Sequence, residues 1–288
     1  MNFPFFFFAL LHSRKTILIS GDTQIGTQQQ LEGYVDGFVG AFDSSITDKP
    51  ILKSISEEQQ VMATDGIKWR SLENRRTSVM VFTSGSTGEP MLLEKTLGQL
   101  SREVQTLNDT FGGNTGNISV LSTVSHQHMY GLLFRVLWPL ASGMVFGAKI
   151  CTKSEEIIQN ASLRESFILV SSPSHLTRLS EYLEWREPRE RLLTVFSSTA
   201  PLSFNGAREI YRLLGNYPIE VYGSSETGGI AWRQQSKKNI GWKAFSGIQV
   251  RAKEDTQQIE LQSPHMPTMK WSLGEDMIEI ENDGEFYL

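Results

Sequence analysis

One short segment of the chain alternates hydroxyl side chains with glycines: Phe82-Thr83-Ser84-Gly85-Ser86-Thr87-Gly88-Glu89-Pro90. It follows an apolar run at residues 78–82, which predicts a buried strand. Such a loop presents backbone N–H groups that no side chain covers, together with hydroxyl donors, and both bind polyphosphate oxygens. The Gly-Lys-Ser/Thr end of a Walker A loop and the Gly-x-Ser-x-Gly of a nucleophile elbow do not occur in it. We expect a phosphate-binding loop here, and the alternative is an ordinary turn.

This segment resembles the phosphate loop of the adenylate-forming superfamily, which includes acyl-CoA synthetases, adenylation domains and firefly luciferases. Other segments resemble further motifs of the superfamily and follow in its order: VSHQHMYG at 124–131, SSTAPL at 197–202, YGSSETGG at 222–229 and GED at 274–276. The resemblance runs from about residue 5 to the end of the chain. The residues around 126–140 and Lys95 are most similar to bacterial AMP-ligases of pigment (aryl-polyene) and fatty-acid pathways.

The resemblance assigns nucleotide-binding roles to two groups of residues. The phosphate loop would hold the β- and γ-phosphates of ATP through Thr83, Ser84, Gly85, Ser86, Thr87 and Gly88. The other motifs would bind the rest of the nucleotide through Thr199, Ala200, Pro201, Tyr222, Gly223, Ser224, Ser225 and Asp276.

Five of the matching residues carry the chemistry that the resemblance implies. Tyr222 would stack on adenine, and its alternative is a core aromatic. Glu226 would ligate Mg²⁺, since this hard cation prefers carboxylate oxygen, and its alternative is a solvated loop residue. Ser225 replaces the usual threonine near the α-phosphate, and Asp276 would bind the ribose hydroxyls or be a turn residue. His128 would line the acyl pocket, either orienting the substrate or merely packing.

The sequence departs from the family pattern at the phosphate loop and at the adenine edge. Met91 stands where the family has a lysine, so we expect Lys95 to supply the missing cation beside the polyphosphate. Ser198 and Thr199 replace a glycine pair, which would tighten the wall against adenine.

The apolar pattern alternates strands and helices up to about residue 230. We expect strands at 16–20, 78–82, 118–121, 144–146, 167–170, 193–196 and 219–222, and hence a mainly parallel sheet. We expect one helix to carry Leu31, Tyr34, Val35 and Phe38, and another to carry Leu97, Leu100, Val104 and Leu107. Short strands at 248–251, 258–261, 277–280 and 286–288 follow.

These elements predict an α/β core over residues 1–230 and a β-rich part over 231–288. The resemblance implies the large domain of an adenylate-forming enzyme: two α/β subdomains with mainly parallel sheets and a small distorted β-barrel. The family's hinge and lysine-bearing lid domain would follow residue 288. We therefore expect a truncated form with little activity alone.

Composition restricts the class of protein and its setting. The chain has 27 Lys and Arg against 32 Asp and Glu, a net charge of −5, which argues against nucleic acid as a partner. The single cysteine, Cys151, excludes an internal disulfide and a cysteine-cluster metal site, and favours a reducing, cytoplasmic setting. The apolar residues 3–11 are too few to span a bilayer, and we expect a buried helix there.

The resemblance implies ATP- and Mg²⁺-dependent activation of a fatty or aryl carboxylic acid. The acyl group would pass from the adenylate to the thiol of coenzyme A or of the phosphopantetheine on an acyl carrier protein. The acid and the acceptor stay open. One alternative is a pseudoenzyme that binds nucleotide without ligation. A hydrolase using a loop serine is weaker, because no serine-base-acid arrangement belongs to any of the motifs.

Overall fold

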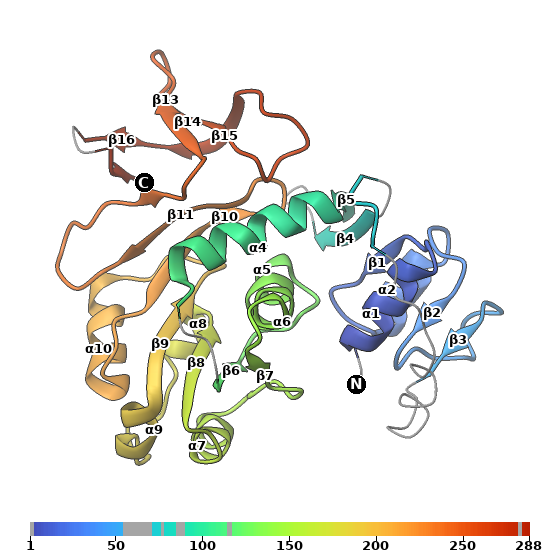
Figure 1. The fold of residues 1–288 in the computed structure, drawn as a ribbon, viewed down its shortest axis with the longest axis horizontal. Coiled ribbons are helices and arrows are strands. Elements are labelled where there is room, and N and C mark those ends of the chain that lie inside the picture. Colours follow the sequence, from blue (N-terminus) through green and yellow to red (C-terminus); the bar gives the residue numbers. More distant parts are fainter. Residues whose placement is uncertain (1–2, 54–70, 76–77, 85–89, 114–116, 282–283) are drawn as a thin grey trace. The chain divides into compact units, whose positions relative to one another are not determined.

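The computed structural model describes residues 3–53, 71–75, 78–84, 90–113, 117–281 and 284–288 (Figure 1). The chain divides into two compact units, Met1–Gly98 and Gln99–Leu288. The division that we expect near residue 230 stays a prediction.

The first unit places a helix beside a small sheet. Its described elements are α1 (Phe3–His12), β1 (Ile17–Ile19), α2 (Ile25–Leu31), β2 (Phe38–Val39), β3 (Ile51–Leu52), β4 (Ser78–Ser84) and β5 (Pro90–Thr96). β1 lies parallel to β4, and β4 lies antiparallel to β5. The candidate phosphate loop therefore joins the ends of β4 and β5. α1 buries Phe6, Phe7 and Leu11, which confirms the buried helix.

The prediction that one helix carries Leu31 and continues through Phe38 was wrong, because α2 ends at Leu31. Phe38 belongs to β2, and Tyr34 is 63% exposed. The Lys49 ammonium donates hydrogen bonds to the carbonyls of Glu32 and Val35. The chain after Leu31 is thus held by a side chain instead of by further helical turns.

The second unit is built on one large sheet. α4 (Leu97–Phe111) leads into it, and the elements up to the last parallel strand are β6 (Ile118–Ser122), α5 (Met129–Gly131), η1 (Leu132–Leu137), α6 (Trp138–Ala141), β7 (Val145–Phe146), α7 (Ser154–Ser162), β8 (Ser166–Ser171), α8 (Pro173–Leu176), α9 (Arg186–Arg191), β9 (Leu192–Ser197), α10 (Phe204–Leu214) and β10 (Ile219–Ser224). The strands that follow are β11 (Gly228–Gln234), β12 (Lys243–Ala244), β13 (Gln249–Ala252), β14 (Gln258–Gln262), β15 (Ser272–Met277), β16 (Glu279–Ile280) and β17 (Phe286–Tyr287).

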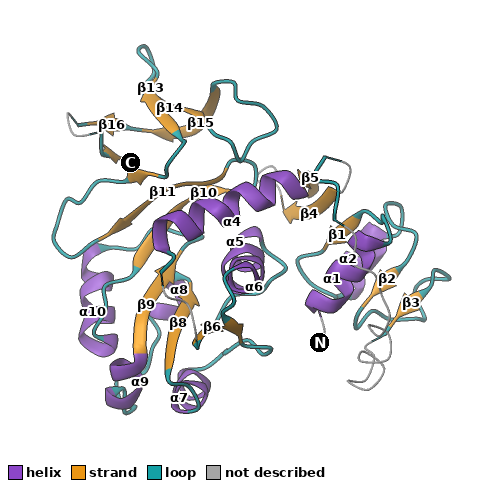
Figure 2. Ribbon diagram, in the orientation of Figure 1, coloured by secondary structure: helices purple, strands orange, loops and turns teal. Residues whose placement is uncertain are grey.

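The large sheet has the strand order β12-β11-β10-β9-β8-β6-β7. The strands from β10 to β7 are parallel, and β11 and β12 extend the sheet antiparallel. Alternate side chains of β8 and β9 pack on opposite faces, as strand geometry requires. On one face Leu169 and Val195 join the core under α7 and α10. On the other, Phe196 packs against Phe111 of α4 and Trp138 of α6, with ring centroids 5.0 and 5.7 Å apart. Figure 2 distinguishes the helices from the strands of this unit by colour. The predicted mainly parallel α/β sheet is confirmed.

The last strands form open sheets. β13, β14 and β15 form a three-stranded antiparallel sheet, and β16 pairs with β17. No closed barrel occurs among the residues that the structure describes, so the distorted barrel of our expectation is an open sheet with a separate hairpin.

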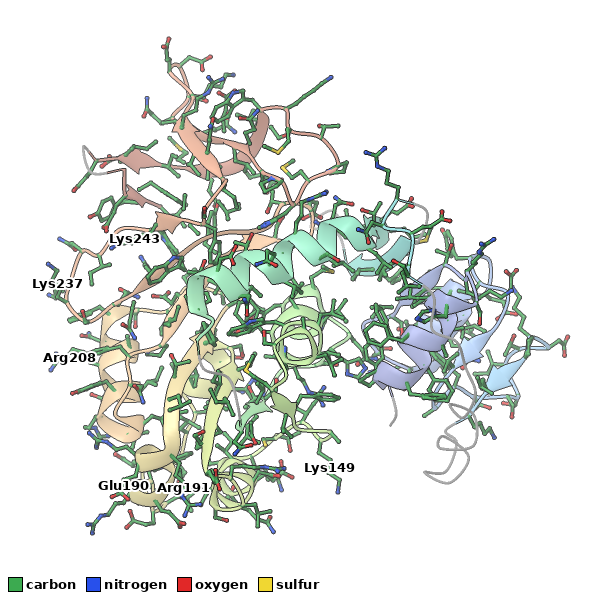
Figure 3. All side chains as sticks on the ribbon, viewed as in Figure 1. Lys149, Glu190, Arg191, Arg208, Lys237 and Lys243 are labelled. Atoms are coloured by element: carbon green, nitrogen blue, oxygen red, sulfur yellow. The ribbon has the colours of Figure 1, made fainter. Side chains whose placement is uncertain are left out.

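Charged side chains cover the outside of the second unit, for example Arg208 on α10 and Lys237 after β11 (Figure 3). Within the described ranges, no helix combines the length and the apolar character needed to cross a bilayer.

Candidate active site

The first part of the site is the segment that leaves β9. Ser198 Oγ donates a hydrogen bond of 2.8 Å to the carbonyl of Val221 on β10, which ties two neighbouring strand ends together. Thr199 follows with φ +81°, in the left-handed region that non-glycine residues rarely adopt and that is common at functional sites. Thr199, Ala200 and Pro201 are exposed. The turn thus presents the three predicted adenine-binding residues to solvent.

A buried polar network holds the far end of this segment in place. Glu220 on β10 is only 3% exposed. Its carboxylate accepts hydrogen bonds from Arg233 Nε at 3.0 Å, from Gln235 Nε2 at 2.6 Å and from the Leu202 amide at 3.3 Å. Gln235 Nε2 also donates to the Leu202 carbonyl at 2.7 Å. Both backbone groups of Leu202 are therefore fixed, and sequence reasoning did not find this network.

The second part of the site is the turn between β10 and β11, at residues 225–227. Its hydroxyls bond locally: the Ser224 amide donates to Thr227 Oγ1 at 3.1 Å, and the Thr227 amide donates to Ser224 Oγ at 3.2 Å. Glu226 is exposed at the tip, and Ser225 beside it is half-buried. The structure thus brings the predicted metal ligand and the predicted α-phosphate residue to one turn.

The third part of the site is a tyrosine held by an aspartate. The half-buried Tyr222 ring packs beside Trp242 and Phe286, with centroids 5.5 and 6.0 Å away. Its hydroxyl donates a hydrogen bond of 2.5 Å to Asp276 Oδ2 on β15. Burial and the bond to this carboxylate raise the pKa of Tyr222 above its ordinary value, so the phenol stays neutral. The structure brings together the residues predicted for adenine and for ribose, which are distant in sequence.

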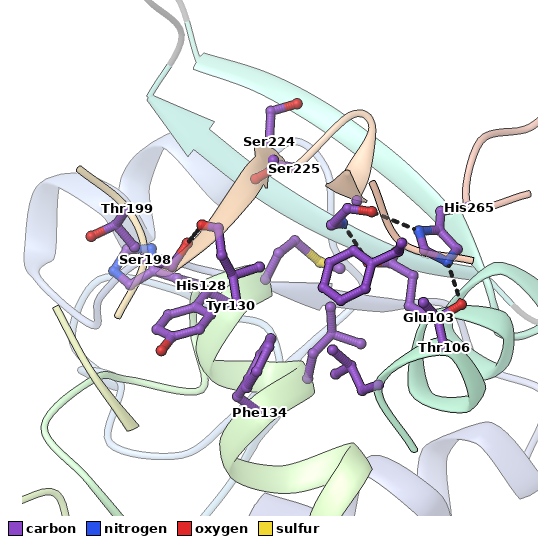
Figure 4. A pocket seen from close by; sticks show the side chains of 18 residues that line it. Glu103, Thr106, His128, Tyr130, Phe134, Ser198, Thr199, Ser224, Ser225 and His265 are labelled. Atoms are coloured by element: carbon purple, nitrogen blue, oxygen red, sulfur yellow. Dashed lines mark hydrogen bonds between the residues drawn. The ribbon is translucent and has the colours of Figure 1, made fainter. Parts of the chain in front are cut away.

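Next to these strand ends lies a pocket of about 280 Å³ (Figure 4). Its apolar wall comes from Leu107, Met129, Leu133, Phe134, Val221 and Phe245, and its polar lining includes Glu103, Thr106, His128, Tyr130, Ser198, Thr199, Ser224, Ser225 and His265. His128 precedes α5 and is exposed, so it lies at the rim. The pocket thus joins the predicted acyl-pocket histidine to both strand-end segments, and whether His128 orients a substrate stays a prediction.

Two buried residues of the pocket wall were not predicted. Glu103 on α4 is 2% exposed, and His265, after β14, is 1% exposed. Glu103 Oε2 accepts a hydrogen bond from the Gly229 amide at 3.3 Å, and His265 Nδ1 bonds the Gly229 carbonyl at 3.0 Å. The two side chains thus hold both sides of one residue at the start of β11. Neither lies in a motif, so the sequence carried no signal for them.

Arg135, a buried arginine, lies beside His126, the histidine two residues before His128. Arg135 Nη1 lies 3.1 Å from His126 Nδ1, and Arg135 Nη2 donates to the Ala148 carbonyl at 2.9 Å. Burial and the nearby guanidinium lower the pKa of His126 from 6.5 to about 4. His126 is therefore neutral at pH 7 and accepts from the arginine.

The remaining predicted site residues belong to the first unit. Gly85, Ser86, Thr87 and Gly88 lie outside the described residues. Thr83 and Ser84 end β4, and Lys95 lies in β5 with 1% of its surface exposed. The roles of these residues stay predictions.

Known proteins resemble the chain in sequence and in fold. A 4-coumarate–CoA ligase of Cereibacter sphaeroides is 28% identical over 154 residues, which are 53% of this chain and 36% of that protein. The fold is similar to that of ATP-bound MatB from Rhodopseudomonas palustris, with a TM-score of 0.70 and 17% identity over 92% of this chain and 61% of that one. It is also similar to O-succinylbenzoate coenzyme A synthetase (MenE) from Bacillus subtilis in complex with ATP and magnesium, with a TM-score of 0.70 and 18% identity over 97% and 61% of the two chains.

The chain spans less than two thirds of the length of each of these proteins. The model of the AMP-binding enzyme family matches residues 12–264, well over half of the chain. With this match, and with the strand-end motifs gathered around one pocket, the chain belongs to the AMP-binding enzyme family.

Proposed function

We propose that this chain takes part in the ATP-dependent activation of a carboxylic acid, forming an acyl-adenylate and pyrophosphate. One observation carries the proposal: the turn that bears Glu226 also lines the pocket, through Ser224 and Ser225. An acid in the pocket and a nucleotide on the strand ends would share this wall. Holding both reactants at one wall makes their reaction effectively intramolecular, which is a large source of rate acceleration.

In the proposed reaction, a carboxylate oxygen of the acid attacks the α-phosphorus of ATP. The bond from that phosphorus to the bridging oxygen breaks, and pyrophosphate leaves with the bonding electrons. Tyr222 would hold the adenine ring, and Asp276, which fixes the tyrosine hydroxyl, would lie near the ribose. Ser225 would donate its hydroxyl to an α-phosphate oxygen as charge develops there.

The donor set at the turn suits magnesium. Glu226 is exposed and lies between Ser225 and Thr227 in the turn, and a hard carboxylate oxygen is what Mg²⁺ prefers. A bound Mg²⁺ neutralises charge on the transferring phosphates. Because Glu226 is exposed, there is room for the water and phosphate oxygens that would complete the coordination of the metal ion.

The pocket volume favours a small acid. Pockets for drug-sized ligands begin at about 300 Å³, and this one measures about 280 Å³. A short aliphatic or an aryl acid fits this volume better than a long fatty acid, and one relative bears the name of an aryl acid, 4-coumarate. We propose a thiol of coenzyme A or of carrier-protein phosphopantetheine as the acceptor. The lone Cys151 supports a cytoplasmic setting.

Calorimetry followed by mass spectrometry tests this proposal. The chain is titrated with ATP and Mg²⁺, then with short and aryl acids, and the mixtures are searched for acyl-adenylate. Nucleotide heat together with an acid-dependent adenylate mass supports activation. Nucleotide binding with no adenylate from any acid would favour the alternative of a binding module. No heat at millimolar nucleotide would refute both.

A further inference from the structure

A row of side chains from neighbouring strands crosses one face of the large sheet. Glu220 and Tyr222 lie two positions apart on β10, so their side chains share a face. Arg233 on β11, which runs beside β10 (Figure 1), is the direct cross-strand partner of Glu220. Trp242 comes immediately before β12, the strand on the other side of β11. Arg233 therefore lies between the network that fixes Leu202 and the aromatic rings beside Tyr222.

The guanidinium of Arg233 makes two kinds of contact. Its edge pairs with the Glu220 carboxylate, with Nε 3.0 Å from Oε1 and Nη2 3.1 Å from Oε2. Its face lies over the indole of Trp242, with Cζ 4.2 Å from the ring centroid, which is the geometry of a cation–π contact. A lysine ammonium cannot form the double bond pair and stack at the same time, because it has no planar face. One side chain thus connects the network at Leu202 to Trp242.

The orientation of the Trp242 indole depends on this contact. Its Nε1 is buried and has no hydrogen-bond partner among the residues that the structure describes, although a buried indole usually finds one. Two backbone hydrogen bonds to Phe286, of 2.7 and 3.1 Å, fix the main chain of Trp242 but do not restrict its side-chain angles. We therefore attribute the plane of the indole to the guanidinium that lies over it and to the rings packed beside it.

The plane of the Tyr222 ring depends in turn on its aromatic neighbours. The hydroxyl oxygen lies on the axis about which the ring turns, so the bond to Asp276 does not by itself fix the ring plane. Trp242 and Phe286, with centroids 5.5 and 6.0 Å away, resist that rotation. A base stacks on the face of an aromatic side chain, so the plane of Tyr222 determines how well adenine can stack.

We propose that Arg233 is a positioning residue for the nucleotide. It holds Trp242, and through Trp242 it holds the Tyr222 ring in the plane that receives adenine. This inference rests on the proposed function, because it takes Tyr222 as the adenine-binding ring. A site whose parts are held before the ligand arrives loses less conformational entropy on binding, so a loosened Tyr222 ring binds adenine more weakly.

Arg233→Lys tests the proposal, because it keeps the positive charge and can still pair with Glu220 but loses the planar face. Calorimetry measures the dissociation constants of AMP and of ATP with Mg²⁺. We expect the affinity for AMP to fall about three- to tenfold, the scale of ordering one side chain on binding.

The chain offers a matched control in a second arginine with the same two kinds of contact. Arg251 Nε lies 2.7 Å from Glu260 Oε2, and its Cζ lies 4.1 Å from the centroid of the Trp271 ring beneath it. Arg251 belongs to β13, a strand that bears none of the predicted site residues. Arg251→Lys should therefore leave the affinity for AMP unchanged.

A double-mutant cycle separates positioning from a general loss of structure. If Arg233 acts through the tyrosine, Arg233→Lys should lower the affinity for AMP by less than about twofold in a chain that already carries Tyr222→Ala. A merely structural role would lower the affinity by the same factor in both backgrounds. Thermal unfolding shows whether each variant is folded at the assay temperature.

Trp242→Phe decides the question if Arg233→Lys does not fold. It keeps the pair between Arg233 and Glu220 and weakens the contact with the guanidinium face, since tryptophan is the strongest cation–π partner. We expect the affinity for AMP to fall about two- to threefold, with Trp271→Phe unchanged as its control. An unchanged affinity of Trp242→Phe would overturn the inference.

The inference is also overturned if Arg233→Lys binds AMP as tightly as wild type, if its loss is equal in both backgrounds, or if Arg251→Lys loses as much. The proposed function then stands, since the wild-type chain still binds nucleotide and Tyr222→Ala still weakens that binding. A wild-type chain that binds neither AMP nor ATP refutes the proposed function, and with it this inference.

Discussion

Two neighbouring strand ends of the large sheet are held in place by different means. The segment after β9 is held at Leu202. The buried Glu220 accepts a hydrogen bond from the Leu202 amide, and the buried Gln235 donates one to the Leu202 carbonyl. The turn after β10 is exposed at Glu226 and is stabilised at its tip by local bonds between Ser224 and Thr227. A buried, satisfied network specifies one geometry, whereas an exposed turn with local bonds opens at low free-energy cost.

The difference matches the tasks that we propose for the two segments. A wall against a flat, rigid adenine ring benefits from a fixed position, since preorganisation lowers the cost of binding. The turn would meet a metal ion and phosphate groups whose positions change as pyrophosphate leaves. A segment that adjusts at little cost suits this task. Substitutions in the network after β9 should therefore change mainly the free energy of unfolding. Substitutions in the turn after β10 should change mainly the Mg²⁺-dependent affinity for ATP.

The largest effect should come from Glu220→Ala. Removing this carboxylate leaves Arg233 and the Leu202 amide without their buried partner, and we expect the free energy of unfolding to fall by about 3–5 kcal/mol. Urea denaturation measures it. The control is Glu209→Ala, whose salt bridge to Arg212 is exposed and should be worth less than about 1 kcal/mol. Equal losses for the two variants would mean that the wall after β9 is not held by this network.

Tyr222→Ala should weaken nucleotide binding. We expect a loss of about 1–3 kcal/mol for AMP and ATP alike, the range for a base stacked on an aromatic ring. Tyr222→Phe keeps the ring and loses only the bond to Asp276, so it separates stacking from positioning. Tyr211→Ala removes an exposed tyrosine on α10 as the control. Calorimetry that finds Tyr222→Ala as tight as wild type would remove the ring from the nucleotide site.

Glu226→Gln should act on the metal and spare the fold. We expect Mg²⁺-dependent affinity for ATP to fall about tenfold, the scale of one charge-assisted contact, while AMP binding changes little. The free energy of unfolding should change by less than about 0.5 kcal/mol, as for most exposed sites. Equal losses for ATP and AMP would assign Glu226 a structural role and would end the contrast between the two strand ends.

The smallest effect concerns pH and a third strand end, after β6. The pKa of His126 is lowered from 6.5 to about 4 in the folded chain, so the unfolded chain binds more protons between these values. Stability should therefore fall as pH falls through that window, by about 1 kcal/mol between pH 7 and 5 after allowance for partial exposure. In His126→Gln this part of the pH dependence should disappear. Urea titrations of both proteins at pH 7, 6 and 5 measure it, and identical slopes would contradict the assignment.

The sequence predicted those features that depend on local pattern. Apolar runs that end in Gly, Ser or Thr marked the strand ends of β9 and β10, because a buried strand must stop where the chain turns. The prediction of a helix through Phe38 was wrong. The Lys49 ammonium, which comes 14 to 17 residues later in the chain, bonds the carbonyls of Glu32 and Val35, which backbone N–H groups would have bonded in a longer helix. Such a side-chain bond leaves no periodic signal.

The pocket wall was missed for a related reason. The apolar stripe of α4, with Leu100 and Leu107, predicted one buried face correctly. Gln99, Glu103 and Thr106 form a second buried stripe, and polar residues at helical spacing are ordinarily exposed. The partner that buries this stripe is His265, and no local pattern connects it with α4.

That partnership also sets when the pocket can first exist during synthesis. Gln99, Arg102 and Thr106 bond to Pro264 and His265, across separations of 159 to 166 residues. At about 5–20 residues per second, α4 must wait roughly ten to thirty seconds after leaving the ribosome before this part of its wall is made. During that interval the α4 side chains that later become buried, Gln99, Glu103 and Thr106, remain in water. A nascent chain stalled before residue 264 would thus carry the parallel strands β6–β10 but no completed pocket, so the pocket forms only late in translation.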